Sequence, residues 1–469
     1  MSNGVMPRLR GPNRCVAAGL GNRWGVAVLI GLALCAATAP VAAARGRRTS
    51  VPAHIPTWAF DDGCSGGVGA RASLVRRWVS YAESNCGALT RKARSDCHSQ
   101  SRTYCRVMQY LDTNWVYPGD RVVRASATSF NWWLTEPSPH QGTSIVTSWM
   151  GNANLTDQNI PAVQAYYRSF VRRYYNGDAG LLMDWQSPSL AQELYYSNCS
   201  CQTTAEIHSD AALREAHARM SAALTHRNGS PFIQADNTLP GNPFLPQGLH
   251  MLNHRIGVDA WTVEGEPMSD GTLMGFYSTL LDQIAYVATR TRGFVVPMSR
   301  APENAPYLAQ TRRVQEATML LGFSPGHLVD WAELEQGSGR LAVWPEEGVY
   351  PTSPVQSMGV PRGHGCLAGT GIVCSRGGHR SLEVAPGIYR REFRSCYRDR
   401  IRFGGCAAVM NTTGSSVPVR SSWLRRRYRH QITFVGGDVQ SGGTVNLTGA
   451  PFMPGRDVIP AHDAILLAP

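Results

Sequence analysis

Lysine is almost absent from this chain of 469 residues: Lys92 is the only one, and arginine supplies the rest of a formal net charge of +12. The hydrophobic content of 43% and the charged content of 17% exclude a disordered chain, a collagen and a coiled coil as overall descriptions. Excess arginine can indicate a nucleic acid, a membrane surface or an acidic glycan as partner. A GC-rich genome also encodes arginine in place of lysine, and this is the stronger interpretation, so the charge favours an acidic glycan only mildly.

Several sequence signatures are missing. No helix-turn-helix, zinc-finger or RNA-binding signature is present, so no nucleic-acid partner is expected. The patterns HExxH, CxxC and GxGxxG are also absent, which argues against a zinc protease, a zinc ribbon and a dinucleotide fold. The histidines do not stand at ligand spacing. We therefore predict neither a metal nor another cofactor.

Residues 1–44 have the composition of a secretion signal. Four arginines and no acidic residue flank the start of the apolar run Gly25–Ala37, and Ala42-Ala43-Ala44 offers a small-residue cleavage site. The run is too short to span a membrane easily as a helix, and Arg45 follows it closely. We predict a secreted or periplasmic protein with no stable membrane insertion after cleavage.

Ten of the twelve cysteines remain after cleavage at that site. An even number of cysteines in an exported chain predicts disulfides. The expected pairs, most of them local in sequence, are Cys64 with Cys105, Cys86 with Cys97, Cys366 with Cys374, and Cys396 with Cys406.

Residues 51–345 alternate short apolar runs with longer amphipathic ones, which is typical of parallel βα units. Strands are predicted at Ile55–Phe60, Tyr104–Leu111, Phe130–Leu134, Gly180–Trp185, Phe232–Asp236, Val258–Glu264, Gly293–Met298 and His327–Trp331. Helices are predicted at Ala70–Glu83, Ile160–Tyr175, His208–Leu224, Gly271–Thr289 and Pro306–Leu321. About eight units predict an α/β fold of the TIM (β/α)8 barrel type. A doubly wound open sheet is the alternative.

Residues 346–469 have a different texture, with frequent glycine, proline and serine and no helical pattern. Short alternating segments are predicted as strands at Ile388–Phe393, Cys406–Asn411, Gln431–Val435, Thr444–Leu447 and Asp463–Leu467. This pattern predicts a small all-β sandwich domain.

Polar groups end nearly every predicted barrel strand, where the chemistry of a TIM barrel takes place. Asp184 and Glu264 each close an apolar strand. Alternation places each of them on the same face of its strand as the residue two positions earlier. Two carboxylates across a pocket are what glycosidic bond cleavage requires, one protonated to assist the leaving oxygen and one ionised. Asp236 and Glu266 are the alternative catalytic residues. An acid after a strand can also be a helix cap or the partner of an arginine.

Tryptophans and further polar groups at the strand ends fit a sugar, whose apolar C–H face packs on an indole ring. The candidate substrate-binding residues are Trp58, Asp61, Asp112, Trp132, Trp133, Trp185, Gln234, Asn237, Trp261, Arg300 and Trp331. A tryptophan in a strand is more often part of the hydrophobic core. A shared sugar-binding site is favoured only by the number of tryptophans expected near one end of the predicted barrel.

The segments LLMDWQSP around Asp184, FIQADNT around Asp236 and GVDAWTVEGEP around Glu264 resemble strand ends of glycoside hydrolase TIM-barrel families. The phrase IPAHDAILL near the C-terminus resembles the last strand of the β-sandwich that closes many such enzymes. These motifs are short, although the layout covers most of the chain. The resemblance implies Asp184 as nucleophile and Glu264 as general acid/base, and it leaves the sugar open.

Together these features predict an exported glycoside hydrolase that acts on a polysaccharide or oligosaccharide, with retention of configuration. The alternative is a glycan-binding barrel of the cell envelope without catalytic activity. Such a protein would use the same tryptophans but would not need two opposed carboxylates.

Overall fold

A computed structural model divides the chain into two compact units, Met1–Val51 and Pro52–Pro469. The first unit, which contains the expected signal segment, lies outside the described residues. In the second unit the structure describes residues 57–61, 79–84, 106–116, 127–128, 132–135, 144–146, 153–174, 180–184, 209, 211–212, 215–216, 219–220, 224, 232–236, 260–269, 271–273, 277–290, 294–301, 304–328, 331–333, 341–342, 344–362, 374–439 and 442–469. Over these residues no helix is long and apolar enough to cross a membrane.

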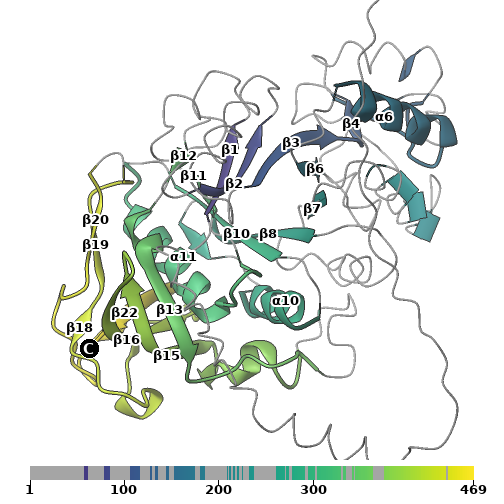
Figure 1. The fold of residues 1–469 in the computed structure, drawn as a ribbon. Coiled ribbons are helices and arrows are strands. Elements are labelled where there is room, and N and C mark those ends of the chain that lie inside the picture. The colour runs from purple at the N-terminus through teal and green to yellow at the C-terminus, as the bar shows by residue number, and fades with distance from the viewer. Residues whose placement is uncertain are drawn as a thin grey trace, which may run out of the picture. The chain divides into compact units, whose positions relative to one another are not determined.

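Eight parallel strands lie side by side in the order of the chain (Figure 1). They are β1 (Thr57–Asp61), β2 (Val79–Ser84), β3 (Arg106–Asp112), β6 (Gly180–Asp184), β7 (Phe232–Asp236), β8 (Ala260–Ser269), β10 (Phe294–Arg300) and β11 (Trp331–Glu333). The short strands β9 (Thr272–Leu273) and β12 (Leu341–Ala342) add antiparallel pairs to β8 and β11. Residues of β1 also contact β11 and β12. The predicted parallel α/β sheet is therefore present.

Two of the predicted elements are wrong. The end of the expected helix Ala70–Glu83 forms β2, because this segment pairs in the sheet with β1 and β3. The expected strand Phe130–Leu134 is not in the sheet, since β3 pairs directly with β6. Of that segment, the described residues form only isolated bridges such as Trp133 with Thr156.

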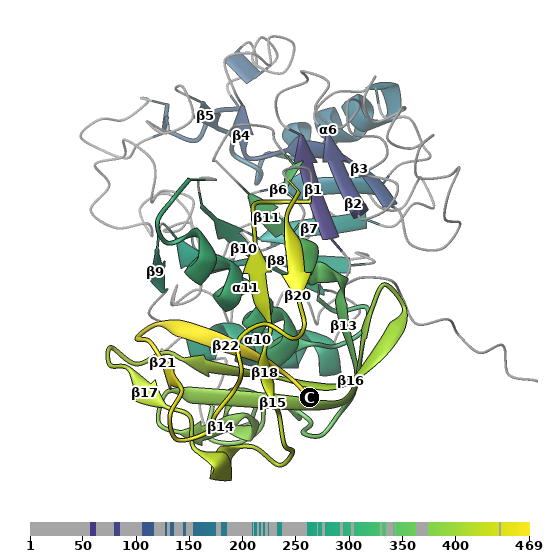
Figure 2. The same ribbon diagram turned by 90° about the vertical axis from the view of Figure 1, so that its left-hand side faces the viewer.

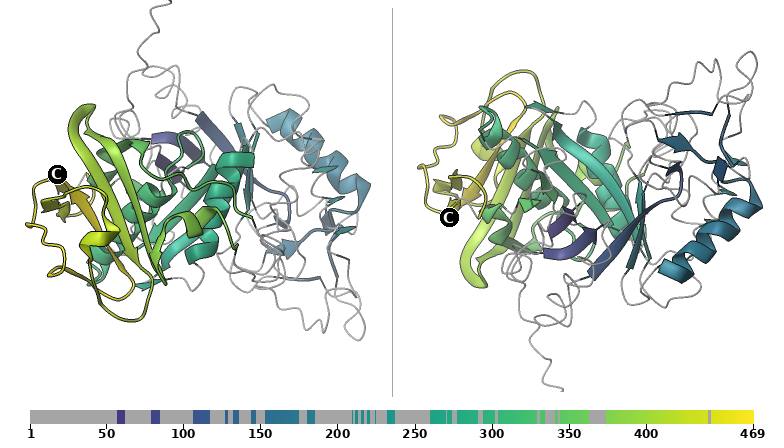
Figure 3. Two further views of the ribbon diagram at one scale, coloured as in Figure 1. Left: turned by 90° about the horizontal axis from the view of Figure 1, so that it is seen from below. Right: turned by 90° about the horizontal axis from the view of Figure 1, so that it is seen from above.

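The segment around residue 132 instead belongs to a separate small layer. Strands β4 (Trp115–Val116) and β5 (Asn154–Leu155) pair beside helix α6 (Pro161–Tyr174). Val116, Trp132, Val163, Tyr167 and Met220 are among the buried residues of one cluster there. The described residues from 211 to 224 are helical, as expected. Figure 3 shows α6 beside β4 and β5.

Helices α10 (Tyr277–Arg290) and α11 (Leu308–Gly322) agree with the predicted helices to within a few residues at most boundaries. Both pack on β8 and β10, and α11 also contacts the C-terminal strands (Figure 1). Every residue from Val314 to Gly322 is buried, as expected for a helix between two layers. A Cβ at Gly322 would lie 2.9 Å from Ile284 Cδ1, so glycine allows α11 to approach α10 closely.

The C-terminal part is an antiparallel sheet in the order β13-β15-β16-β22-β18, with β14 paired to β15 (Figure 2). Its strands are β13 (Val349–Pro354), β14 (Glu383–Ala385), β15 (Ile388–Arg398), β16 (Ile401–Asn411), β18 (His430–Gln431) and β22 (Asp463–Ala468). Two further pairs are β17 (Val417–Pro418) with β21 (Val458–Ile459), and β19 (Thr433–Val435) with β20 (Thr444–Asn446). Three short 3-10 turns connect these strands, η2 (Pro345–Gly348), η3 (Gly378–Ser381) and η4 (Ser421–Trp423). The expected sheet-rich region is confirmed, while β13, β14, β17 and β21 were not predicted.

The antiparallel sheet is covered on both faces. Val409 and Ile465 belong to a buried cluster that includes Val419, Trp423 and Phe452 from the segments after β16. Helix α11 contacts β15, β16 and β22. The predicted boundary at 345/346 falls within η2.

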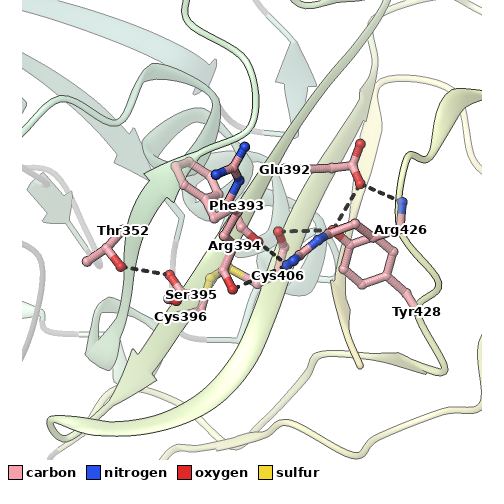
Figure 4. The surroundings of a disulfide bond; sticks show 9 residues. All are labelled: Thr352, Glu392, Phe393, Arg394, Ser395, Cys396, Cys406, Arg426 and Tyr428. Atoms are coloured by element: carbon pink, nitrogen blue, oxygen red, sulfur yellow. Dashed lines mark hydrogen bonds between the residues drawn. A yellow bond between two sulfur atoms is a disulfide. The ribbon is translucent and has the colours of Figure 1, made fainter.

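One predicted disulfide, Cys396 with Cys406, is confirmed, with a Cα–Cα distance of 5.9 Å (Figure 4). It joins β15 to β16 close to their turn, where Asp399 and Arg400 have φ of 49° and 70°. Cys374 is also disulfide-bonded, as expected for one member of the predicted 366–374 pair. The other predicted partners, Cys64, Cys86, Cys97, Cys105 and Cys366, lie outside the described residues.

Opening the 396–406 disulfide is expected to lower the free energy of unfolding by about 2–3 kcal/mol, because the bond removes conformational freedom from the unfolded chain. The measurement is urea unfolding of the variant with both Cys396→Ser and Cys406→Ser, compared with the unreduced protein. An unchanged unfolding free energy would contradict the expectation.

Candidate active site

Carboxylates end most strands of the parallel sheet at the same edge. Asp61, Asp112, Asp184 and Asp236 are the last residues of β1, β3, β6 and β7. Glu264 is the fifth residue of the ten-residue strand β8, and Glu266 the seventh. The carboxyl ends of parallel strands meet at one edge, so these residues gather there.

The strand register relates three of the candidate carboxylates, Asp184, Asp236 and Glu264. Met183, Gln234 and Trp261 form one row across β6, β7 and β8. Asp184 lies one residue beyond this row along β6. Asp236 lies two residues beyond it along β7, and Glu264 lies three residues beyond it along β8. Because successive strand residues alternate between the two faces, Asp184 and Glu264 share an alternation and Asp236 has the opposite one.

Asp112 and Asp184 are direct register partners on neighbouring strands β3 and β6. Asp112 therefore shares the alternation of Asp184. Asp112, Asp184 and Glu264 therefore share the same alternation in their strands at this edge of the sheet. Glu266 cannot be assigned to it by counting, because the β8–β10 register shifts between Pro297 and Ser299.

The remaining predicted site residues are spread over several positions. Gln234 and Trp261 lie in the row of Met183, on the opposite alternation from Asp184. Trp58 pairs with Tyr81 in β1 and β2, and Trp331 pairs with Met298 in β11 and β10. Trp185 and Asn237 lie outside the described residues.

Trp132 and Trp133 lie in the α6 layer rather than in a strand of the parallel sheet. Trp132 is only 6% exposed, and its ring centroid is 5.1 Å from that of Tyr166. Trp133 is partly buried against the same cluster. Their placement fits a hydrophobic core, which is the role weighed against sugar binding above.

Two strand-end residues were missed by the sequence analysis. Glu333 ends β11 and is the register partner of Arg300, the last residue of β10. Ser84 ends β2 and is the register partner of Asp61. The alternation of polar and apolar residues in Trp331-Ala332-Glu333 is the sequence signal for Glu333. It was missed because the eighth strand was expected to end at Trp331.

Buried polar contacts fix the helices that cover β8 and β10. The main-chain N–H of His379 donates to Asp282 Oδ1 at 2.9 Å, and His379 Nδ1 lies 2.8 Å from Oδ2. Gly378 has a φ of 51°, and a Cβ there would lie 1.9 Å from Asp282 Oδ1. These contacts join α10 to η3 and so fix the position of α10, which packs on β8 and β10.

A second set of contacts holds α11. Arg391 Nη1 donates to the carbonyl oxygens of Leu321 at 2.6 Å and Phe323 at 2.9 Å, where the C-terminal end of the helix favours a cation. Burial lowers the pKa of the Arg391 guanidinium to about 10. Burial also raises the pKa of the Tyr389 hydroxyl to about 12. These groups have structural partners, so their shifted pKa values reflect burial rather than a reaction.

Over the described residues, no group of three or more His, Cys, Asp or Glu side chains is placed to hold a metal ion. The candidate site consists of carboxylates at strand ends, with Arg300 at the end of β10, the strand next to β8.

No protein-family model matches the chain, and no curated protein matches it. Among solved structures, the chain is similar to the glycoside hydrolase domain of PelA from Pseudomonas aeruginosa, with 14% identity and a TM-score of 0.37 over 59% of this chain and 94% of that one. It is similar to a trehalose-6-phosphate hydrolase from Bacillus licheniformis, with 9% identity and a TM-score of 0.45 over 89% and 99% of the two chains. An α-galactosidase from Geobacillus stearothermophilus gives 9% identity and a TM-score of 0.41 over 88% and 55%.

Proposed function

We propose that this protein is an exported glycoside hydrolase that cleaves a polysaccharide or oligosaccharide by a retaining mechanism. In this proposal Asp184 is the nucleophile and Glu264 the general acid/base. The observation that carries the proposal is the strand register, which gives both residues the same alternation at the carboxyl edge of the sheet, with only β7 between their strands.

The separation of the two strands suits this chemistry. Neighbouring strands are about 4.8 Å apart and successive residues about 3.3 Å, so Asp184 and Glu264, two strands and two residues apart, have backbones roughly 12 Å apart. Two carboxyl groups that extend toward each other from such positions can reach the separation of about 5–5.5 Å that retaining enzymes use. Asp236 is closer to Asp184 in the sheet, but its opposite alternation makes it the weaker candidate.

We also propose that the eight parallel strands close into a (β/α)8 barrel, with the C-terminal sheets forming a β-sandwich. The contacts of β1 with β11 and β12 support closure, because the first and last strands of an open sheet would not meet. Closure brings the carboxyl ends of all eight strands around one mouth.

Asp112 adds a third role to the site. As the register partner of Asp184, it would stand beside the nucleophile and accept hydrogen bonds from sugar hydroxyls. Two neighbouring carboxylates repel each other when both are ionised, so one of them holds a proton more strongly or a hydroxyl or cation lies between them.

The test is hydrolysis of a broad panel of polysaccharides and aryl glycosides by the wild type and the variants Asp184→Asn and Glu264→Gln. The proposal expects wild-type cleavage that both folded variants lose. The matched control is Asp236→Asn, which removes one carboxylate of the opposite alternation and should leave most activity.

Two outcomes would contradict the proposal. Glycan binding by all proteins without any cleavage would favour a non-catalytic glycan-binding protein. Cleavage that survives in both Asp184→Asn and Glu264→Gln would leave a hydrolase with a different site.

A further inference from the structure

Positive charge is concentrated in the C-terminal part of the chain. Residues 374–469 contain 14 arginines and six acidic residues, a formal charge of +8. Residues 51–373 contain 24 basic and 27 acidic residues, a formal charge of −3. A genome that encodes arginine in place of lysine would affect both parts alike and would not separate their charges. The separation therefore indicates an anionic partner for the C-terminal part.

Four exposed arginines of this part, Arg394, Arg425, Arg426 and Arg427, form what we call the arginine ledge. Its backbone is held by one buried carboxylate (Figure 4). The main-chain N–H groups of Arg425 and Arg426 donate to Glu392 at 3.0–3.1 Å, and Glu392 is 0% exposed in β15. The ledge is thus anchored to the antiparallel sheet rather than carried on a free loop.

A side-chain contact completes the ledge. Arg426 Nη1 donates to the carbonyl oxygens of Phe393 at 3.4 Å and Arg394 at 3.2 Å, which brings the segment beside Arg394 (Figure 4). A Cβ at Gly405 would lie 2.6 Å from Arg426 Nη1, so glycine leaves room for the guanidinium. Fixed positions reduce the entropy that binding would otherwise cost.

Among the residues that the structure describes, the charge of the ledge has no carboxylate counter-charge in contact with it. Within the described part of the chain, none of its four arginines forms an ion pair with a carboxylate side chain. Glu392 already accepts hydrogen bonds from Arg390 and from the Tyr428 hydroxyl. Like charges held together without counter-charge cost free energy, and a bound polyanion would relieve that cost.

The chemistry of the segment selects among polyanions. Guanidinium groups pair with carboxylates, sulfates and phosphates through two parallel hydrogen bonds. Trp423 and Tyr428 are buried, at 6% and 4% exposure, so neither offers a ring on which a nucleic-acid base or a neutral sugar could stack. None of the exposed large hydrophobic side chains of the described residues lies between 420 and 430, as insertion into a lipid surface would require.

We propose that the arginine ledge binds an acidic polysaccharide through its carboxylate or sulfate groups. That this polysaccharide is also the chain cleaved at the strand ends rests on the proposed function. Recognition by charge leaves the neutral hydroxyls of the glycan free for the strand-end site.

The test is binding of polygalacturonate by the full chain carrying Asp184→Asn, which is expected to prevent turnover. Adding Arg425→Gln and Arg427→Gln should weaken binding roughly tenfold and flatten its salt dependence, because charge-assisted hydrogen bonds are lost. The matched control adds Arg362→Gln and Arg376→Gln, two exposed arginines outside the ledge, with the same change in net charge. Neutral pullulan should bind much more weakly to every protein.

Equal losses in the ledge and control variants would overturn the proposal, because net charge alone would then explain binding. Tighter binding of duplex DNA or of phosphatidylglycerol vesicles than of polygalacturonate would also overturn it. Absence of hydrolysis in the panel above, with ledge-dependent binding retained, would refute the proposed function and leave the ledge assignment standing.

Discussion

Glu264→Gln should reduce cleavage of substrates with poor leaving groups by about 10²–10⁴-fold, because the glutamine cannot protonate the departing oxygen. Glycosides with a dinitrophenyl leaving group need little protonation and should lose much less in the bond-breaking step. The measurement is kcat/KM for a series of aryl glycosides of decreasing leaving-group acidity. The loss should grow steadily along that series.

The control for this prediction is Glu266→Gln, two residues further along β8. It should leave the dependence on the leaving group unchanged. The reverse pattern, with a steep dependence in Glu266→Gln and none in Glu264→Gln, would transfer the acid role to Glu266. Added azide, a nucleophile that needs no deprotonation, should accelerate the second step only in the variant that lacks the acid/base.

The main strands of the parallel sheet could be predicted because their sequences are continuous apolar runs that end in a polar residue. The segments around Asp184 and Asp236 were found within one residue of β6 and β7. Strand β2 could not be found, because Val79–Ser84 continues a helical pattern and only pairing with β1 and β3 makes it a strand. Tertiary pairing here overrides the local pattern.

The acidic residues at the strand ends could be found in the sequence, but their positions relative to one another across the sheet could not. The sequence shows that carboxylates follow strands, and alternation within one strand is visible in it. The register between strands depends on hydrogen bonding across the sheet, so the partnership of Asp112 with Asp184 required the structure. The position of Trp132–Leu134 outside the sheet likewise depends on which strands pair.

The buried contacts between α11 and the C-terminal part were also invisible in the sequence. Arg312 lies in α11, and Glu346 lies 34 residues later in a turn that the sequence marks only by its proline. Arginine and glutamate are rarely buried without a partner, so neither residue type suggests an interior position. Their burial follows from the packing of the two layers.

Glu346→Leu should lower the free energy of unfolding by about 3–5 kcal/mol, because it leaves the Arg312 guanidinium buried without a counter-charge. In the native protein the two side chains are 3% and 2% exposed, and Arg312 donates to Glu346 through Nε at 2.7 Å and Nη2 at 2.6 Å. The guanidinium also lies 4.9 Å from the Trp344 ring centroid, so it is enclosed on several sides. Urea unfolding followed by circular dichroism measures the loss.

The double variant Arg312→Met/Glu346→Leu should recover most of that loss, because it removes both desolvated charges at once. The matched control is Arg380→Ala, which breaks the Arg380–Glu383 pair whose arginine is 46% exposed, and it should cost less than about 1 kcal/mol. A double variant as unstable as Glu346→Leu alone would show that packing around Arg312 and Trp344, rather than an unpaired charge, sets the cost. A small effect in all three variants would show that the contact between α11 and η2 contributes little, and that the antiparallel sheet holds α11 mainly through Arg313 and Arg391.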